Sequence, residues 1–290
     1  MMNEYVEKFY PHSTAVILTN KCSAACRECC FNCSPKGDLI LSDEKIFKFI
    51  DEISALGTVK YMVWTGGEAF LLKDRLYQCL QYAKNKGLYS RIVSNGYWAT
   101  SDEIAHVKLK KLKEAGLAEL NISTGDNHQE FVPFDRVMIA ALESVRLGIS
   151  TVISVESNKS MKFSTEDLYK HPLFLKMKEE NVDGLLTVIS AAWVSFHKDT
   201  KYDFDCIEQT EVEHGCNNLF NFVGLHPDGQ YIACCGLTLN YLPEMHLGSL
   251  DDINLVTAFD NQKKRFHEKM VVYRWSNQYI KTSESLGSYY

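Results

Sequence analysis

Three cysteines near the start of the chain are spaced so that they could hold an iron–sulfur cluster. The run Cys22-Ser-Ala-Ala-Cys26-Arg-Glu-Cys29 comes directly after a strand-like stretch, 13–19. Three thiolates bind three corners of a [4Fe–4S] cluster and leave the fourth iron open to another ligand. A structural zinc site takes four ligands, usually as two separated pairs, and a disulfide framework is typical of smaller secreted chains. The spacing therefore favours a cluster with one open iron.

Two further polar motifs follow the next two strand-like stretches. They are Thr65-Gly66-Gly67-Glu68 and Ser94-Asn95-Gly96. Glycines let backbone groups approach a ligand closely, and a carboxylate can hold a cationic amine. Taken singly, each motif is also an ordinary turn between a strand and a helix. Their position at consecutive strand ends favours one shared binding site.

The elements that would carry these motifs alternate along the chain. Six apolar, β-branched runs predict strands at 14–18, 60–64, 90–93, 119–123, 151–155 and 185–189. Each precedes a segment of helical period, which is the pattern of repeated βα units on a parallel sheet. The first helix is expected to begin at Ser42 and to end at Gly57, with Ile46, Phe49 and Ile53 on one face.

Six βα units predict an α/β fold, a partial (β/α)6 barrel of the TIM type, over residues 1–200. Its active site would lie at the carboxyl ends of the strands, where the cysteine triplet falls. Shorter elements at 201–290 predict a small α+β appendage, with a hairpin at 220–225 and 230–233 and a helix at 252–269.

Composition narrows the class of protein. The chain has 290 residues, of which 46% are hydrophobic and 23% charged, enough for a sizeable core. Its net charge of −6 argues against a nucleic-acid partner, which would need clustered Lys and Arg. No stretch resembles a signal peptide or a membrane span, so we expect a cytoplasmic protein without a membrane partner. Ten cysteines in a reducing compartment favour ligands over disulfides.

Together these motifs resemble the radical S-adenosylmethionine (SAM) superfamily, through Cys22, Cys26 and Cys29 and through the Gly-Gly-Glu segment. The resemblance covers about residues 13–193. It implies a [4Fe–4S] cluster whose open iron chelates SAM, and a 5′-deoxyadenosyl radical that removes a substrate hydrogen. It also implies that Gly-Gly-Glu binds the amino group of SAM and that later strand ends reach its ribose. The residues expected to bind the cofactor are Gly66, Gly67, Glu68, Ser94, Asn95, Ser123 and Glu156.

One residue departs from the superfamily pattern, and several others have ordinary explanations. Glu28 stands before the third cysteine, where the superfamily commonly has an aromatic residue, and this predicts different packing around the adenine. Cys79 lies in a helical pattern and is expected in the core. His128, at the fourth strand end, is expected to be a surface or hydrogen-bonded histidine rather than a substrate contact.

A narrower resemblance is to the radical SAM peptide epimerases that make epipeptides. The shared segments are 29–35, 65–70, 94–98 and 231–235. In that family a radical takes an α-hydrogen from an L-residue and a cysteine thiol returns one from the other face. The resemblance assigns that thiol to Cys235.

A competing interpretation concerns a second cluster. Cys216 and Cys234 fit the spacing that opens the SPASM and twitch auxiliary-cluster domains, so 201–290 resembles a remnant of such a domain. However, no cysteine follows Cys235, so Cys206, Cys235 or ligands other than cysteine would replace the usual downstream ligands. If Cys235 binds a cluster, it cannot also be a free hydrogen donor.

The leading hypothesis is therefore a radical SAM enzyme that epimerises a ribosomally made peptide, reduced by a donor such as flavodoxin or ferredoxin. One alternative is a radical SAM enzyme that forms thioether or carbon–carbon crosslinks, or that acts on a small molecule. Another is a non-catalytic iron–sulfur or zinc protein for electron transfer or scaffolding. The non-catalytic alternative accounts for the cysteines but not for the two polar motifs at successive strand ends.

Overall fold

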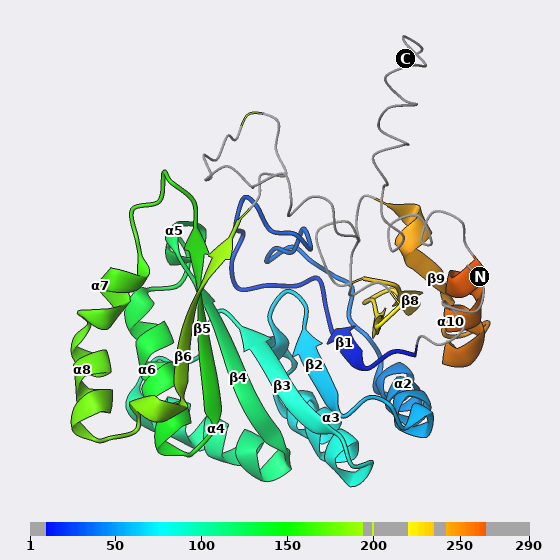
Figure 1. Cartoon of the computed structure of the whole chain (residues 1–290), viewed down its shortest axis with the longest axis horizontal. Helices are drawn as coiled ribbons and strands as arrows, with labels where there is room; N and C mark the ends of the chain where they lie inside the picture. Colours follow the sequence, from blue (N-terminus) through cyan, green and yellow to red (C-terminus); the bar gives the residue numbers. More distant parts are fainter. Residues whose placement is uncertain (1–9, 194–198, 200–219, 235–241, 265–290) are drawn as a thin grey trace, which may run out of the picture.

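A parallel sheet of six strands forms the first part of the protein (Figure 1). The computed structural model describes residues 10–193, 199, 220–234 and 242–264. The six strands are β1 (Ser13–Ile17), β2 (Tyr61–Thr65), β3 (Tyr89–Ser94), β4 (Leu117–Thr124), β5 (Ser150–Ser157) and β6 (Leu186–Ala192). They lie side by side in chain order, each parallel to the next. Each overlaps its predicted range, so the six predicted parallel strands are confirmed.

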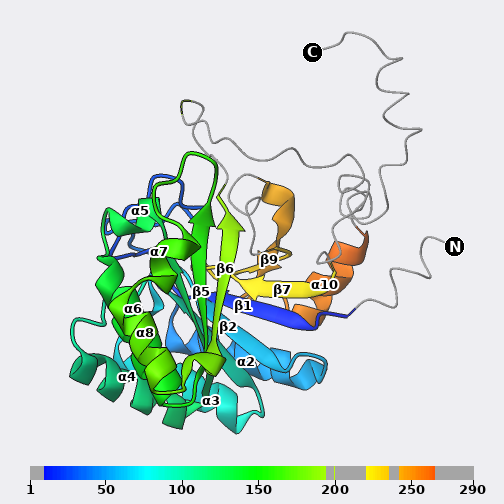
Figure 2. The ribbon, with the colours of Figure 1, turned by 60° about the vertical axis from the view of Figure 1, so that its left-hand side comes forward.

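Helices cover the outer face of this sheet and connect its strands. They are α2 (Asp43–Leu56), α3 (Asp74–Asn85), α4 (Asp102–Ala115), α5 (Asp126–Gln129), α6 (Phe134–Arg146), α7 (Thr165–Tyr169) and α8 (Pro172–Glu179), with 3₁₀ turns η1 (Ala69–Leu72) and η2 (Asp183–Leu185). Helices α2, α3, α4, α6 and α8 pack in succession. In Figure 2, β6 stands nearly upright while β1 and β7 run across the view. The sheet therefore twists strongly and curves part of the way round a barrel, as predicted.

Local sequence fixes where the first of these helices begins and ends. The Ser42 hydroxyl accepts the Lys45 backbone N–H at 3.3 Å, which caps the amino-terminal end of α2. Gly57 ends the helix in the left-handed conformation, with a φ of 71°. Between them the predicted stripe is buried against the sheet, including Phe49 and Ile53. Burial of each such side chain contributes about 1.5–3 kcal/mol.

The C-terminal segment continues the same sheet rather than starting another. Strand β7 (Phe222–Leu225) pairs in parallel with β1, and β8 (Gln230–Ile232) and β9 (His246–Ser249) follow as antiparallel strands. The turn η3 (Pro243–Met245) precedes β9, and helix α10 (Leu255–Lys264) packs on α2. The predicted hairpin is present. The boundary at residue 200 remains a prediction, although the two predicted units share one sheet.

A contact between the first and last parts of the chain holds this segment in place. The Tyr231 hydroxyl donates to Glu52 Oε2 of α2 at 2.5 Å. The same oxygen accepts the backbone N–H of Leu255, the first residue of α10, at 3.0 Å. One carboxylate thereby joins the hairpin and the last helix to the first helix.

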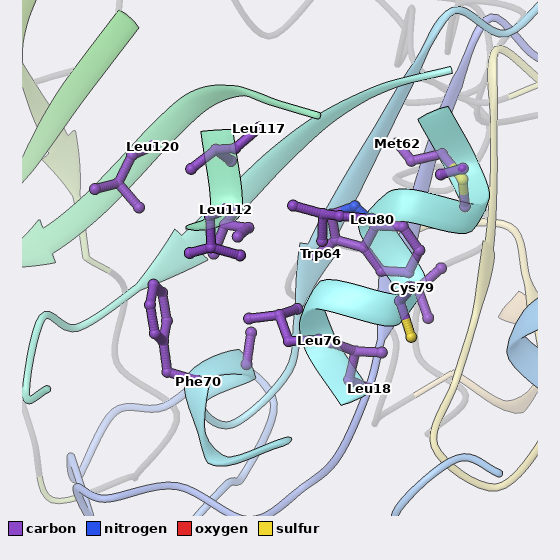
Figure 3. Packing of buried hydrophobic residues seen from close by; sticks show 14 of the residues in the cluster. Leu18, Met62, Trp64, Phe70, Leu76, Cys79, Leu80, Leu112, Leu117 and Leu120 are labelled. Carbon is purple, nitrogen blue, oxygen red and sulfur yellow. The ribbon is translucent and has the colours of Figure 1, made fainter. Parts of the chain in front are cut away.

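The main core lies between the sheet and the outer helices. Trp64 of β2 is fully buried there, and Figure 3 shows it against Leu80 and Cys79 of α3. Its indole N–H donates to Ser90 Oγ of β3 at 2.9 Å, so its polar atom is satisfied. Cys79 is a core residue, as predicted. Among the described residues, every helix is too short or too polar to cross a bilayer.

Candidate active site

The cysteine triplet lies on a long loop that leaves β1 at the carboxyl end of the sheet. The loop returns on itself, because Leu41 N–H donates to the Leu18 carbonyl at 3.0 Å and Cys22 N–H to the Ser34 carbonyl at 3.0 Å. Phe31, within the loop, packs against a small apolar cluster on the inner face of β1 and β7. The sheet therefore positions the triplet as expected for the first βα loop of such a barrel.

All three thiols of the triplet line one cavity of ≈ 270 Å³ at the strand ends. The cavity wall also contains residues of both polar motifs and of the ends of β4 and β6: Thr65, Gly66, Gly67, Val93, Ser94, Asn95, Ser123, His128, Ala192 and Trp193. Segments separated by more than 170 residues of sequence thus meet at one site. The three motifs therefore line one cavity, and its use as a cofactor site stays a prediction.

The three thiols of the triplet differ in how readily they lose their protons. Burial raises the pKa of the Cys22 thiol to about 11 and that of Cys26 to about 12. By contrast, a hydrogen bond from the Cys33 side chain lowers the pKa of Cys29 to about 6. Buried thiols must lose their protons to bind metal, and the metal charge compensates for that loss.

The geometry of the donors fits a cluster better than a single ion. Among the described residues, no three His, Cys, Asp or Glu side chains are close enough to share one metal ion. A [4Fe–4S] cluster binds each cysteine through a different iron, so its ligands need not converge on one point. Cys22, Cys26 and Cys29 are thus suited to hold such a cluster.

The two glycines after β2 allow the cysteine loop to lie against the strand end. A Cβ on Gly67 would lie 2.1 Å from the Lys21 carbonyl oxygen, and one on Gly66 would lie 2.6 Å from the Thr19 carbonyl oxygen. Gly67 N–H donates to the Thr19 carbonyl at 2.7 Å. Sequence reasoning expected these glycines to let backbone approach a ligand. They line the cavity, and they also let the cysteine loop approach β2.

Glu68 ties the ends of β2 and β3 together beneath the cavity. Its side chain is fully buried and accepts hydrogen bonds from Ser94 Oγ at 2.9 Å, Asn95 N at 2.9 Å and Phe70 N at 3.1 Å. Burial raises the pKa of this carboxyl to about 7. It does not line the cavity. The predicted role of its carboxylate at a ligand amine stays a prediction, and the part of the motif that lines the cavity is Gly66 and Gly67.

The predicted ribose contacts have different positions. Ser94 and Ser123 line the cavity, at the ends of β3 and β4. Glu156 does not, because it is buried behind His128. Its carboxylate accepts Asn127 N–H at 2.9 Å and approaches His128 Nδ1 at 2.5 Å. The role of Glu156 at the ribose stays a prediction. In the structure its carboxylate fixes the position of His128.

His128 and Trp193 are wall residues that sequence reasoning did not assign to the site. Their rings lie 5.0 Å apart in an edge-on arrangement. His128 was expected to be hydrogen-bonded, which is confirmed, but its place on the cavity wall was missed. The signal was its position in Gly125-Asp126-Asn127-His128, at the same sheet edge as the other motifs.

Two cysteine-loop residues also reach the cavity. Glu28 has 2% of its surface exposed and lines the cavity, with Arg27 Nε 3.6 Å from its carboxylate. Its predicted effect on adenine packing stays a prediction. Cys33 is buried beside Cys29, with its backbone N–H 3.4 Å from Cys29 Sγ. It therefore packs against a predicted ligand.

The cysteines of the C-terminal segment bear on the predicted hydrogen donor and second cluster. Cys235, Cys216 and Cys206 lie outside the described residues. Cys234 is described, is half-buried and packs against the main core. It does not line the cavity that holds the triplet. The roles of Cys235, Cys216 and Cys234 stay predictions.

Residues 16–152, which include the cysteine triplet and strands β2 to β4, match the family model described as "Radical SAM superfamily". The chain therefore contains a radical SAM domain. It is similar to the "Putative peptide biosynthesis protein YydG" of Bacillus subtilis (strain 168), with 24% identity over 229 residues, which cover 78% of this chain and 70% of that protein. The resemblance to the superfamily noted in the sequence is confirmed.

A second relative and two solved structures extend the comparison. The mitochondrial GTP 3′,8-cyclase of Arabidopsis thaliana is 32% identical over 149 residues, covering 47% of this chain and 36% of that enzyme. BtrN in complex with AdoMet and 2-DOIA has a TM-score of 0.56 at 14% identity, covering 90% of this chain and 87% of that one. AnSMEcpe with AdoMet and the Cp18Cys peptide has a TM-score of 0.58 at 15% identity, covering 90% and 82%. At these identities the structures support the fold alone.

Proposed function

We propose that this radical SAM enzyme modifies a ribosomally made peptide by converting L-residues to D-residues. The main support for radical SAM activity is that Cys22, Cys26 and Cys29 line one cavity with Gly66 and Gly67. The similarity to a protein described as a peptide biosynthesis protein supports a peptide substrate. The sequence pair Cys234-Cys235 supports epimerisation as the specific reaction.

Different residues of the cavity would have different roles in this reaction. Cys22, Cys26 and Cys29 would hold the cluster, and the backbone at Gly66 and Gly67 would contact the methionine part of SAM. When bound, the cluster and SAM together supply reductive cleavage and removal of a hydrogen atom from a C–H bond. Trp193 on the cavity wall would help to keep water away from this reaction.

In the proposed reaction, the thiol of Cys235 completes the exchange of hydrogen at the α-carbon. The α-hydrogen of an L-residue leaves with 5′-deoxyadenosine, and the Cys235 S–H then gives its hydrogen atom to the opposite face of the α-carbon. The remaining sulfur radical takes one electron and one proton to become a thiol again. A low-potential one-electron donor such as flavodoxin or ferredoxin supplies that electron and the one that cleaves SAM.

The test begins with SAM cleavage by protein reconstituted anaerobically with iron and sulfide. With dithionite and SAM, the protein is expected to form 5′-deoxyadenosine. An intact cluster without that product would overturn the radical SAM function. Zinc in place of iron after anaerobic preparation would instead support the scaffold alternative.

Peptide products in deuterated water separate the possible modifications. Epimerisation raises the peptide mass by one unit per site, whereas a crosslink lowers it by two hydrogens. The Cys235→Ala variant is expected to cleave SAM but to incorporate no solvent hydrogen. An unchanged epimer yield in that variant would remove Cys235 from the mechanism. An auxiliary cluster held by Cys216 and Cys234 would appear as iron in excess of four per chain.

A further inference from the structure

Asn95 follows β3 and reaches across to the cysteine loop that follows β1. Its side chain is buried, with 6% of the residue surface exposed. Its backbone N–H donates to Glu68 Oε2 at 2.9 Å, which fixes the main chain at this point. The side-chain amide is therefore presented from a rigid strand end, between Ser23 and Cys22.

The hydrogen bonds of Asn95 determine which way its amide points. Its Oδ1 accepts the backbone N–H of Tyr97 at 3.0 Å. The reversed orientation would set two N–H groups against each other, so Nδ2 must lie on the far side. There Nδ2 lies 3.0 Å from Ser23 Oγ and 3.6 Å from Cys22 Sγ. An amide nitrogen has two hydrogens, which suffices for one bond to each.

Cys22 thus receives hydrogen bonds from two different parts of the fold. The Ala24 backbone N–H lies 3.4 Å from Cys22 Sγ and belongs to the cysteine loop itself. The Asn95 amide comes from another strand, 73 residues away in sequence. Cys29 Sγ, by comparison, has a backbone donor from Cys33 in its own loop, at 3.4 Å.

We propose that Asn95 is a positioning residue that sets the reduction potential of the cluster through its hydrogen bond to Cys22 Sγ. Reduction adds negative charge to the cluster and its sulfur ligands, and an N–H dipole aimed at a ligand sulfur stabilises that charge. The bond therefore makes the cluster easier to reduce. The inference rests on the proposed function, because it requires that Cys22 be a cluster ligand.

The test is a potentiometric titration of reconstituted protein without SAM or peptide, followed by electron paramagnetic resonance. Asn95→Leu keeps the size of the side chain but has no N–H group. At the midpoint potential of the wild type, where half of the clusters are reduced, we expect less than a tenth to be reduced in Asn95→Leu. Ser23→Ala is the control, because it removes the other acceptor of Nδ2 and keeps the bond to Cys22. Its reduced fraction should be half or more.

A second measurement uses only the wild-type protein, so it does not require that a variant bind its cluster. Wild-type protein labelled with ¹⁵N at the asparagine side chains is expected to give a ¹⁵N coupling in the pulsed spectrum of the reduced cluster. Absence of that coupling, or an unchanged midpoint potential in fully loaded Asn95→Leu, would overturn the inference. Failure of the wild type to bind a cluster would contradict the proposed function instead, so the two failures are distinguishable.

Discussion

His128 Nδ1 lies 2.5 Å from Glu156 Oε1, and this contact places an imidazole on the wall of the cavity that contains the cysteine triplet. The same carboxylate accepts the backbone N–H groups of Asn127 at 2.9 Å and His128 at 3.1 Å. Gly125 leaves room for it, because a Cβ there would lie 2.4 Å from Glu156 Cβ. The ends of β4 and β5 are thus joined around one buried carboxylate, which fixes the orientation of the ring.

This relationship predicts that Glu156 acts on cofactor binding through His128. In Glu156→Gln the charge is lost, and an amide N–H group replaces one of the acceptor oxygens. Hydrogen bonds to charged groups contribute about 1.5–3 kcal/mol, so we expect SAM affinity to fall by about tenfold or more. Equilibrium dialysis with reconstituted protein measures the dissociation constant, and iron and sulfide analysis checks that cluster content is unchanged.

The matched control for this prediction is Glu166→Gln. Glu166 is a glutamate in α7 whose side chain is 82% exposed, so its replacement should leave SAM affinity unchanged. His128→Gln should weaken SAM binding in the same way as Glu156→Gln. Equal affinity in wild type and both site variants would show that His128, held by Glu156, does not act on cofactor binding.

Gly67 predicts a steric test of the fit between the cysteine loop and β2. In Gly67→Ala the new methyl group would lie 2.1 Å from the Lys21 carbonyl oxygen, so the loop must move. We expect a loss of stability of about 3 kcal/mol and a cluster content below half that of the wild type. Urea unfolding and iron analysis measure the two effects.

Gly184→Ala is the control for that substitution. A Cβ on Gly184 would meet no atom within 4 Å, and its φ is not in the left-handed region. Its stability should be unchanged or higher by about 0.4–1 kcal/mol, because alanine restricts the unfolded chain. Normal cluster content in Gly67→Ala would show that the loop does not depend on this close approach.

Sequence reasoning recovered the strands and the edge of the sheet where the site lies, because each signal is local. Alternation of apolar runs predicted six strands, and Ser42 and Gly57 marked the ends of α2. Because the strands are parallel, Gly66 and Ser94, which lie at the ends of two of them, are expected at the same edge of the sheet. The residues that carry these signals are close in sequence to the elements they define.

Contacts between distant segments were not predictable in the same way. The orientation of Glu68 and Glu156 depends on backbone N–H groups of neighbouring strand ends, which no spacing reveals. Their predicted contacts with SAM stay predictions, and the structure shows both as buried acceptors that join neighbouring strand ends. Likewise, nothing local to the last hairpin indicates that β7 pairs with β1.

The assignment of ligands within the cysteine-rich loop makes a further prediction. Cys26 and Cys30 both line the cavity, but only Cys26 belongs to the triplet. Cys26→Ala should lose most of its iron and sulfide after reconstitution, because two thiolates hold the cluster less well than three. Cys30→Ala should keep the wild-type iron and sulfide content. Equal iron loss in the two variants would mean that the ligand set is not the triplet.

The buried carboxyl of Glu68 predicts how the stability of the metal-free protein depends on pH. Burial raises the pKa of Glu68 from 4.5 to about 7 in the folded state. Between these values the unfolded chain has lost this proton while the folded chain keeps it, so stability falls as pH rises. The effect is complete near pH 7 and amounts to about 3 kcal/mol. Urea unfolding at pH 5, 6, 7 and 8 under reducing conditions measures it. In Glu68→Gln the decrease of stability with pH should be smaller by this amount, and in the control Glu166→Gln it should be unchanged. Parallel stability profiles for wild type and Glu68→Gln would mean that the pKa of Glu68 is not raised.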